Sequence, residues 1–143
     1  MTADNSRNGW VIAGIIYAIA VFAVGFALGT VRVLLLAPRV GPLLAVAVEI
    51  PIMLWVSWKI SHWCCGRYSL STAFSTRASM GLIAFALLML LELATSLFVF
   101  GNSWSGYLDS FKSTAASIGL AAQIAFAAIP VIQGQRAAGR NRG

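Results

Sequence analysis

Residues 10–37 read WVIAGIIYAIAVFAVGFALGTVRVLLLA, and Arg32 is the only charged side chain in this run. An α-helix rises 1.5 Å per residue, so the run would be roughly 40 Å long as a helix. That length exceeds the roughly 30 Å hydrocarbon core of a bilayer. The run is also too long for the apolar core of a signal peptide, and only Arg7 is basic before it. We therefore expect a retained membrane-spanning helix that is tilted or emerges at one end.

Three further apolar runs follow, at residues 43–58, 79–100 and 115–132. Pro38 and Pro42 mark the end of the first helix, whereas Pro51 and Pro130 fall inside the second and fourth runs. Proline is tolerated in a spanning helix where neighbouring helices satisfy the freed backbone groups. The pattern predicts an all-α protein, an integral membrane four-helix bundle over residues 10–132. An N-terminal tail (1–9) precedes it, and a basic, disordered C-terminal tail (133–143) follows it.

The composition agrees with a membrane protein and argues against a nucleic-acid-binding one. Apolar residues make up 59 % of the 143-residue chain and charged residues 10 %, whereas soluble proteins contain about 25 % charged residues. The net charge is +6. Because the charges lie between and after the apolar runs, we expect anionic lipid headgroups near the basic tail to be their partners, with no role for nucleic acid.

The distribution of basic residues predicts the orientation. The N-tail, the second connection and the C-tail share one side and contain seven basic residues: Arg7, Lys59, Arg67, Arg77, Arg136, Arg140 and Arg142. The other side contains three: Arg32, Arg39 and Lys112. Cytoplasmic loops of membrane proteins are enriched in Lys and Arg. Both termini are therefore predicted to be cytoplasmic.

Five polar side chains from four segments are predicted to share one layer in the outer leaflet. The helical rise puts Glu49, Glu92 and Gln123 about 9, 10 and 12 Å below the outer edge. A charge at such a depth costs at least a few kcal/mol unless it has a partner. The proposed cluster is Arg32, Arg39, Glu49, Glu92 and Gln123. It is either a structural ion-pair network or a polar cavity, open to the outer face, that binds a proton, a cation or a headgroup.

Small residues recur at steps of three and four on the same faces as these polar residues. Such faces let helix backbones approach closely. The residues expected to pack helices together are Gly14, Ala18, Gly25, Gly29, Gly81 and Gly119.

Other candidate chemistry is sparse. His62, Cys64 and Cys65 lie together after the second run, but zinc sites use four ligands with more widely spaced cysteines. A Ser-His-acid triad would need His62, which is predicted to lie on the opposite side from both glutamates. We therefore expect no metal, no cofactor and no catalytic residue.

The third connection contains Trp104, Tyr107, Leu108 and Phe111 at helical spacing. This spacing predicts a short helical turn in the outer interface, with its apolar side towards the lipid. Its role is either ordinary anchoring or that of a lid or docking surface over the polar layer.

Residues 25–53 read GFALGTVRVLLLAPRVGPLLAVAVEIPIM. Their Gly25-x-x-x-Gly29-x-x-Arg32, Pro38-Arg39-x-Gly41 and Glu49-x-Pro51-x-Met53 patterns resemble an uncharacterised family of small four-span bacterial inner-membrane proteins. The segments from Met80-Gly81 to Glu92 and from Gly119 to Gln123 are similar as well. The resemblance implies a multi-pass protein of the bacterial inner membrane, and it implies no catalytic role.

Three functions remain open from the sequence. Small size, the small-residue faces and the lack of a catalytic set favour a non-catalytic accessory or assembly subunit of a larger membrane complex, with protein partners or further copies of itself. A second hypothesis is a small oligomeric transporter or channel with Glu49 and Glu92 in its pathway. A third is a lipid-modifying enzyme that uses a glutamate as acid or base at the outer leaflet.

Overall fold

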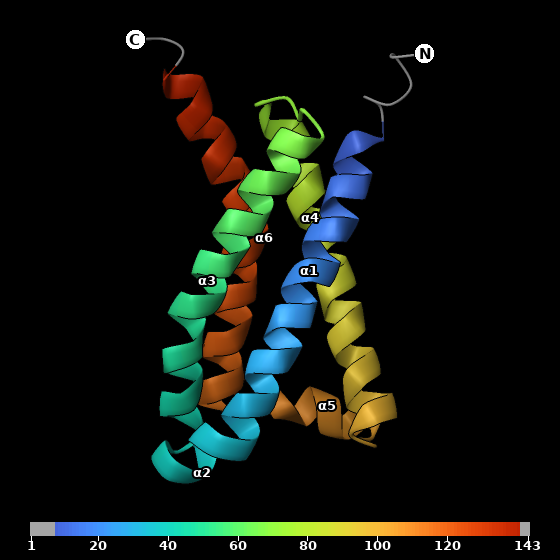
Figure 1. Ribbon diagram of the computed structural model, residues 1–143. Helices are drawn as coiled ribbons and strands as arrows, with labels where there is room; N and C mark the ends of the chain where they lie inside the picture. The colour runs from blue at the N-terminus through green and yellow to red at the C-terminus, as the bar shows by residue number, and fades with distance from the viewer. Residues whose placement is uncertain (1–7, 141–143) are drawn as a thin grey trace.

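The computed structural model describes residues 8–140, and within them the protein is helical with no strand. Four long helices form the body: α1 (Gly9–Val31), α3 (Pro42–Arg67), α4 (Phe74–Ala94) and α6 (Thr114–Arg140) (Figure 1). Two short helices connect them, α2 (Ala37–Val40) and α5 (Trp104–Ser110). Two π-helical turns, η1 (Arg32–Leu36) and η2 (Thr95–Val99), continue α1 and α4.

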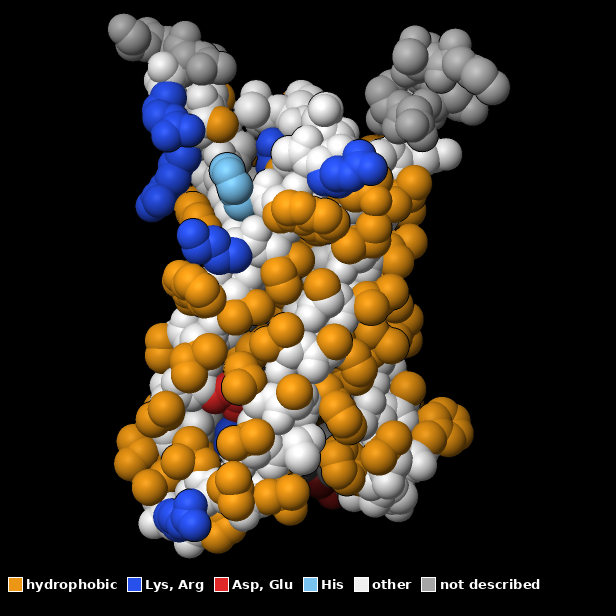
Figure 2. Space-filling view, viewed as in Figure 1, with side chains coloured by type: hydrophobic (Ala, Val, Ile, Leu, Met, Phe, Trp, Pro, Cys, Tyr) orange, Lys and Arg blue, Asp and Glu red, His pale blue; other side chains and the backbone are white. Residues whose placement is uncertain are grey.

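The four long helical segments are long and apolar enough to cross a membrane. The shortest has 26 residues, which corresponds to about 39 Å of helix. Large apolar side chains stay exposed along the body, among them Leu34 at 68 %, Leu82 at 68 % and Phe98 at 85 %. Figure 2 shows hydrophobic side chains over most of this surface, with most of the visible basic ones near one end. Such a surface suits lipid and is unusual in water.

Each long helix of the bundle packs against two others. α1 contacts α3 and α4, and α6 contacts the same two helices from the other side. Gly9 and Arg140, the first helical residue of α1 and the last of α6, lie at one end of the bundle, called here the terminal end (Figure 1). α2 and α5 lie at the opposite end, called here the α2–α5 end. The short helix predicted around Trp104 is present as α5.

Two helices extend further than hydropathy predicts. α3 continues past residue 58 to Arg67, and α6 continues past residue 132 to Arg140. The prediction of a disordered tail is therefore wrong for residues 133–140, while Arg7, Arg142 and the rest of 1–7 and 141–143 lie outside the described residues. Gln133 explains the extension, because its Nε2 donates to the Trp58 carbonyl (2.8 Å) and its Oε1 accepts from Ser61 Oγ (2.9 Å). These contacts hold the start of this polar part of α6 against α3, and the Gln, Arg and Ala residues that follow are good helix formers.

Small residues bring the helices close in the half of the bundle nearer the terminal end. Ala13 and Ala18 are fully buried, and the backbone of Gly81 lies directly against the Ala127 carbonyl of α6. A Cβ on Gly14 would lie 2.9 Å from the Met80 carbonyl oxygen. Gly29 and Gly119 instead line the large cavity described below, and Gly119 has no neighbour within 4 Å of a Cβ position.

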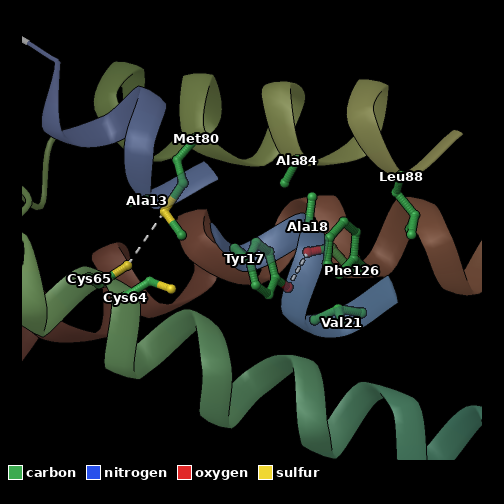
Figure 3. Close-up of a cluster of buried hydrophobic side chains, with 10 residues drawn as sticks. All are labelled: Ala13, Tyr17, Ala18, Val21, Cys64, Cys65, Met80, Ala84, Leu88 and Phe126. Atoms are coloured by element: carbon green, nitrogen blue, oxygen red, sulfur yellow. Dashed lines mark hydrogen bonds between the residues drawn. The ribbon is translucent and has the colours of Figure 1, made fainter. Parts of the chain in front are cut away.

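Tyr17, the only tyrosine among the buried core residues of the described chain, is the hydrogen-bond partner of a carbonyl that a proline in α6 leaves free. Pro130 has no N–H, so it leaves the carbonyl of Phe126, four residues earlier, without its helical hydrogen bond. The hydroxyl of Tyr17, from α1, donates to that carbonyl at 3.0 Å (Figure 3). The Tyr17 and Phe126 rings also stack, with centroids 4.3 Å apart. Tyr17 is fully buried, so this hydroxyl has found the partner that a buried donor needs.

We expect Tyr17→Phe to lower the free energy of unfolding by about 1–2 kcal/mol, because it leaves the Phe126 carbonyl unsatisfied. In a Pro130→Ala background the same change should cost at most half as much, since the restored N–H of residue 130 reaches that carbonyl. Thermal or denaturant unfolding of the four proteins in one detergent measures this coupling. Equal costs of Tyr17→Phe in the two backgrounds would contradict the assignment.

Candidate functional site

A cavity of about 860 Å³ opens between the four long helices at the α2–α5 end. It is called here the large cavity. All four long helices, both π-helical turns and α5 contribute to its lining. Four of the five residues of the predicted polar cluster line it, each from a different segment: Arg32, Glu49, Glu92 and Gln123.

Arg32 and Glu49 form an ion pair across the gap between η1 and α3. Arg32 Nε lies 2.5 Å from Glu49 Oε2, and the two side chains are 31 % and 17 % exposed. The Nε–H does not point along this line, so the contact is an ion pair without an aligned hydrogen bond. Figure 2 shows acidic and basic atoms at the otherwise hydrophobic surface between α1 and α3. Both residues line the large cavity and both side chains are partly exposed, so the ion pair forms part of the cavity wall between η1 and α3.

Glu92 has a different partner. The Nε2 of Gln123 donates to both carboxylate oxygens of Glu92, at 2.6 Å each. Within the described residues no Lys or Arg forms an ion pair with Glu92. Arg32, the only cationic side chain in the lining, is engaged by Glu49. Glu92 is thus a partly buried carboxylate held by an amide alone.

The lining combines negative charge with aromatic surface. With both carboxylates ionised, two negative charges face one positive charge, so the large cavity has a net charge of −1. Apolar atoms provide most of the remaining lining, and six aromatic side chains contribute to it: Phe22, Phe26, Phe100, Tyr107, Phe111 and Phe126. The cavity can therefore accept an apolar body that bears a positive charge.

Arg39 lies outside the cluster, contrary to the sequence prediction. It is in α2, is exposed, and forms no ion pair with a described residue. In a regular α-helix Arg32 and Arg39, seven residues apart, would share one face. The π-helical turn η1 between them adds a residue to one turn, which rotates Arg39 away from the face that Arg32 uses.

α5 contributes to the lining of the large cavity residues that are not part of the predicted polar cluster. Tyr107 and Phe111, in and next to α5, line the large cavity and pack edge to face with ring centroids 5.2 Å apart. Burial raises the pKa of the Tyr107 phenol, and the charge of Glu92 raises it further. The hydroxyl therefore stays protonated as a hydrogen-bond donor at neutral pH. In the sequence, the helical spacing of Trp104, Tyr107 and Phe111 is the feature that indicates a short helix next to the polar cluster.

The sulfur and imidazole groups lie elsewhere. Cys64 and Cys65 are buried in α3, and Cys65 Sγ donates to Met80 Sδ at 3.7 Å (Figure 3), while His62 is exposed. Within residues 8–140 no group of three or more His, Cys, Asp or Glu side chains could hold a metal ion.

No protein-family model, curated protein or solved structure matches this chain.

Proposed function

We propose that this protein is a multi-pass protein of the bacterial inner membrane, with both termini in the cytoplasm, that reversibly binds a cationic amphiphile in the large cavity. We further propose that it acts as one protomer of a small oligomeric transporter. The observation that supports this most directly is Glu92, a carboxylate that lines the cavity and has an amide but no cation as its contact.

The charge balance favours a cation. Arg32 compensates Glu49, so a ligand that enters the large cavity meets the remaining negative charge of Glu92. A buried charge without a partner is unfavourable, and a ligand cation or a proton relieves the same cost. Cations and protons should therefore compete for this carboxylate.

The size and lining favour an amphiphile. The volume of about 860 Å³ falls within the roughly 300–1,000 Å³ typical of small-molecule pockets. Phe22 and Phe26 contribute aromatic rings and apolar surface to the lining that the ligand would contact. Arg32 and Glu49 are partly exposed in this lining, so the ligand would enter from the lipid between η1 and α3.

The test uses tetraphenylphosphonium, a permanent lipophilic cation, titrated into the purified full-length protein in detergent by calorimetry. We expect saturable binding that Glu92→Gln weakens at least tenfold, because the remaining carboxylate is already paired with Arg32. Asp109→Asn is the matched control. Asp109 is an exposed acid at the same end, pairs with Lys112 and does not line the cavity. That change should alter the affinity by less than twofold.

Tetraphenylborate, which has the same shape and the opposite charge, tests the sign of the site. We expect it to bind at least tenfold more weakly than the phosphonium. The proposal fails if the borate binds equally well, or if Asp109→Asn weakens cation binding as much as Glu92→Gln does.

An accessory or assembly subunit of a larger complex is the second candidate. Its sequence support includes small-residue faces that would pack against a partner, but Gly14, Ala18 and Gly81 pack within the chain itself. The broad exposed apolar surface is compatible with protein partners as well as with lipid. Stoichiometric co-purification of one partner in mild detergent, without phosphonium binding, would favour this function. No observation favours the lipid-modifying enzyme over these two.

A further inference from the structure

A second cavity, of about 780 Å³, lies at the terminal end between α3, α6 and the start of α4. It is called here the terminal pocket. Its polar lining is basic or neutral: Trp58, His62, Arg77, Gln133, Arg136 and Arg140. The described acids Glu49, Glu92 and Asp109 all lie towards the α2–α5 end, and Asp4 lies outside the described residues. The terminal pocket is therefore a concentration of positive charge without a carboxylate in its described lining.

Arg77 is the buried member of this group. It is 6 % exposed, its Nε donates to the Ser71 carbonyl at 2.8 Å, and its Nη2 donates to the Leu70 carbonyl at 3.1 Å. These carbonyls orient the guanidinium but do not neutralise its charge. A buried charge normally has a counter-charge, because its removal from water is costly. No described residue forms an ion pair with Arg77.

Arg136 and Arg140 complete the site from α6. They follow Gln133 at steps of three and seven, so the three side chains share one face of the helix. Gln133 fixes that face against α3 through its hydrogen bonds to Ser61 and Trp58. The Arg136 guanidinium lies 5.2 Å from the centre of the Trp58 ring. Both arginines are exposed, so their donors remain free to meet a ligand.

We propose that the terminal pocket binds a phosphate group, either free or in the headgroup of an anionic phospholipid. Guanidinium groups match phosphate oxygens with paired, charge-assisted hydrogen bonds, and the three arginines converge from two helices on one pocket. The phosphate supplies the counter-charge that Arg77 lacks. This site is independent of the large cavity and of the function proposed for it.

The test measures phosphate binding with two probes and the full-length protein. Native mass spectrometry of the detergent-solubilised protein compares phosphatidylglycerol with phosphatidylcholine of the same acyl chains, and calorimetry follows inorganic phosphate. We expect one tightly bound phosphate group, and we expect the double variant Arg136→Gln, Arg140→Gln to weaken its binding about tenfold or more. Arg136 and Arg140 are exposed, so their substitution should weaken phosphate binding without affecting folding. Arg77 is left unchanged because its hydrogen bonds to the Leu70 and Ser71 carbonyls support the fold.

The matched control is the double variant Lys59→Gln, Arg67→Gln. It removes the same charge from the same end of the bundle, at residues that do not line the terminal pocket. We expect less than a twofold effect from it. Tight binding of phosphatidylglycerol alone would identify a lipid headgroup as the ligand, and tight binding of inorganic phosphate would identify a soluble one. Failure of the wild-type protein to bind either probe, or equal losses in both double variants, would overturn the proposal.

Discussion

Gly81→Ala is expected to lower the free energy of unfolding by about 3 kcal/mol, one of the largest effects of any single methyl group in this bundle. A Cβ at this position would overlap the carbonyl oxygen of Ala127 in α6. Overpacking of a core typically costs 1–3 kcal/mol. Here the obstacle is backbone, which cannot move aside as a flexible side chain can. The contact between α4 and α6 must therefore open, and the apparent melting temperature of the detergent-solubilised protein should fall sharply.

Two other glycines provide the control for this prediction. Gly66 and Gly119 are helical and have no neighbour within 4 Å of a Cβ position. Alanine is favoured over glycine in a helix by up to about 1 kcal/mol. Gly66→Ala and Gly119→Ala should thus leave the melting temperature unchanged or raise it. If Gly81→Ala behaves as these two variants do, the close approach of α4 and α6 is not as described.

Arg32→Met should lower the free energy of unfolding by about 1–3 kcal/mol, because it leaves Glu49 without its partner in an apolar wall. The ion pair is partly exposed, so we expect less than the roughly 3–5 kcal/mol typical of a broken buried pair. The double variant Arg32→Met, Glu49→Gln should recover most of that loss, since both charges are then removed. Unfolding measurements on the two single variants, the double variant and the wild type give the coupling energy.

The exposed pair of Asp109 and Lys112 serves as the reference for this cycle. Their side chains are 62 % and 80 % exposed. Exposed ion pairs contribute less than about 1 kcal/mol, so the cycle with Asp109→Asn and Lys112→Met should show little coupling. Coupling at Arg32 and Glu49 no larger than at this surface pair would mean that their contact does not hold η1 to α3.

The sequence was sufficient to predict the four long helices, and four of the five polar residues that it grouped line the large cavity. Each apolar run is long and continuous, and the helical rise per residue predicts similar depths for Glu49, Glu92 and Gln123. Depth alone does not select partners, however. The division into one ion pair, Arg32 with Glu49, and one amide–carboxylate pair depends on how each helix is rotated about its axis.

Three features could not be predicted from hydropathy: two arise from contacts between distant segments, and one is a local irregularity of the backbone. The continuation of α6 to Arg140 depends on Gln133 meeting Trp58 and Ser61 of α3, which the polar composition after residue 132 conceals. The exclusion of Arg39 depends on η1, and a π-helical turn leaves no clear trace in hydropathy. The role of Tyr17 in satisfying the carbonyl freed by Pro130 is a further example of such a long-range contact.

The uneven charge along the bundle makes the molecule an electric dipole. Among the described residues, the terminal end has a formal charge of +5, from Lys59, Arg67, Arg77, Arg136 and Arg140, whereas the three acids and three bases towards the α2–α5 end cancel. Moving one charge across a potential of 100 mV changes the free energy by about 2.3 kcal/mol. In a bilayer that is negative inside, inverting the protein would thus cost roughly 11 kcal/mol per 100 mV from these five charges. An energised membrane would hold the protein with its terminal end inside.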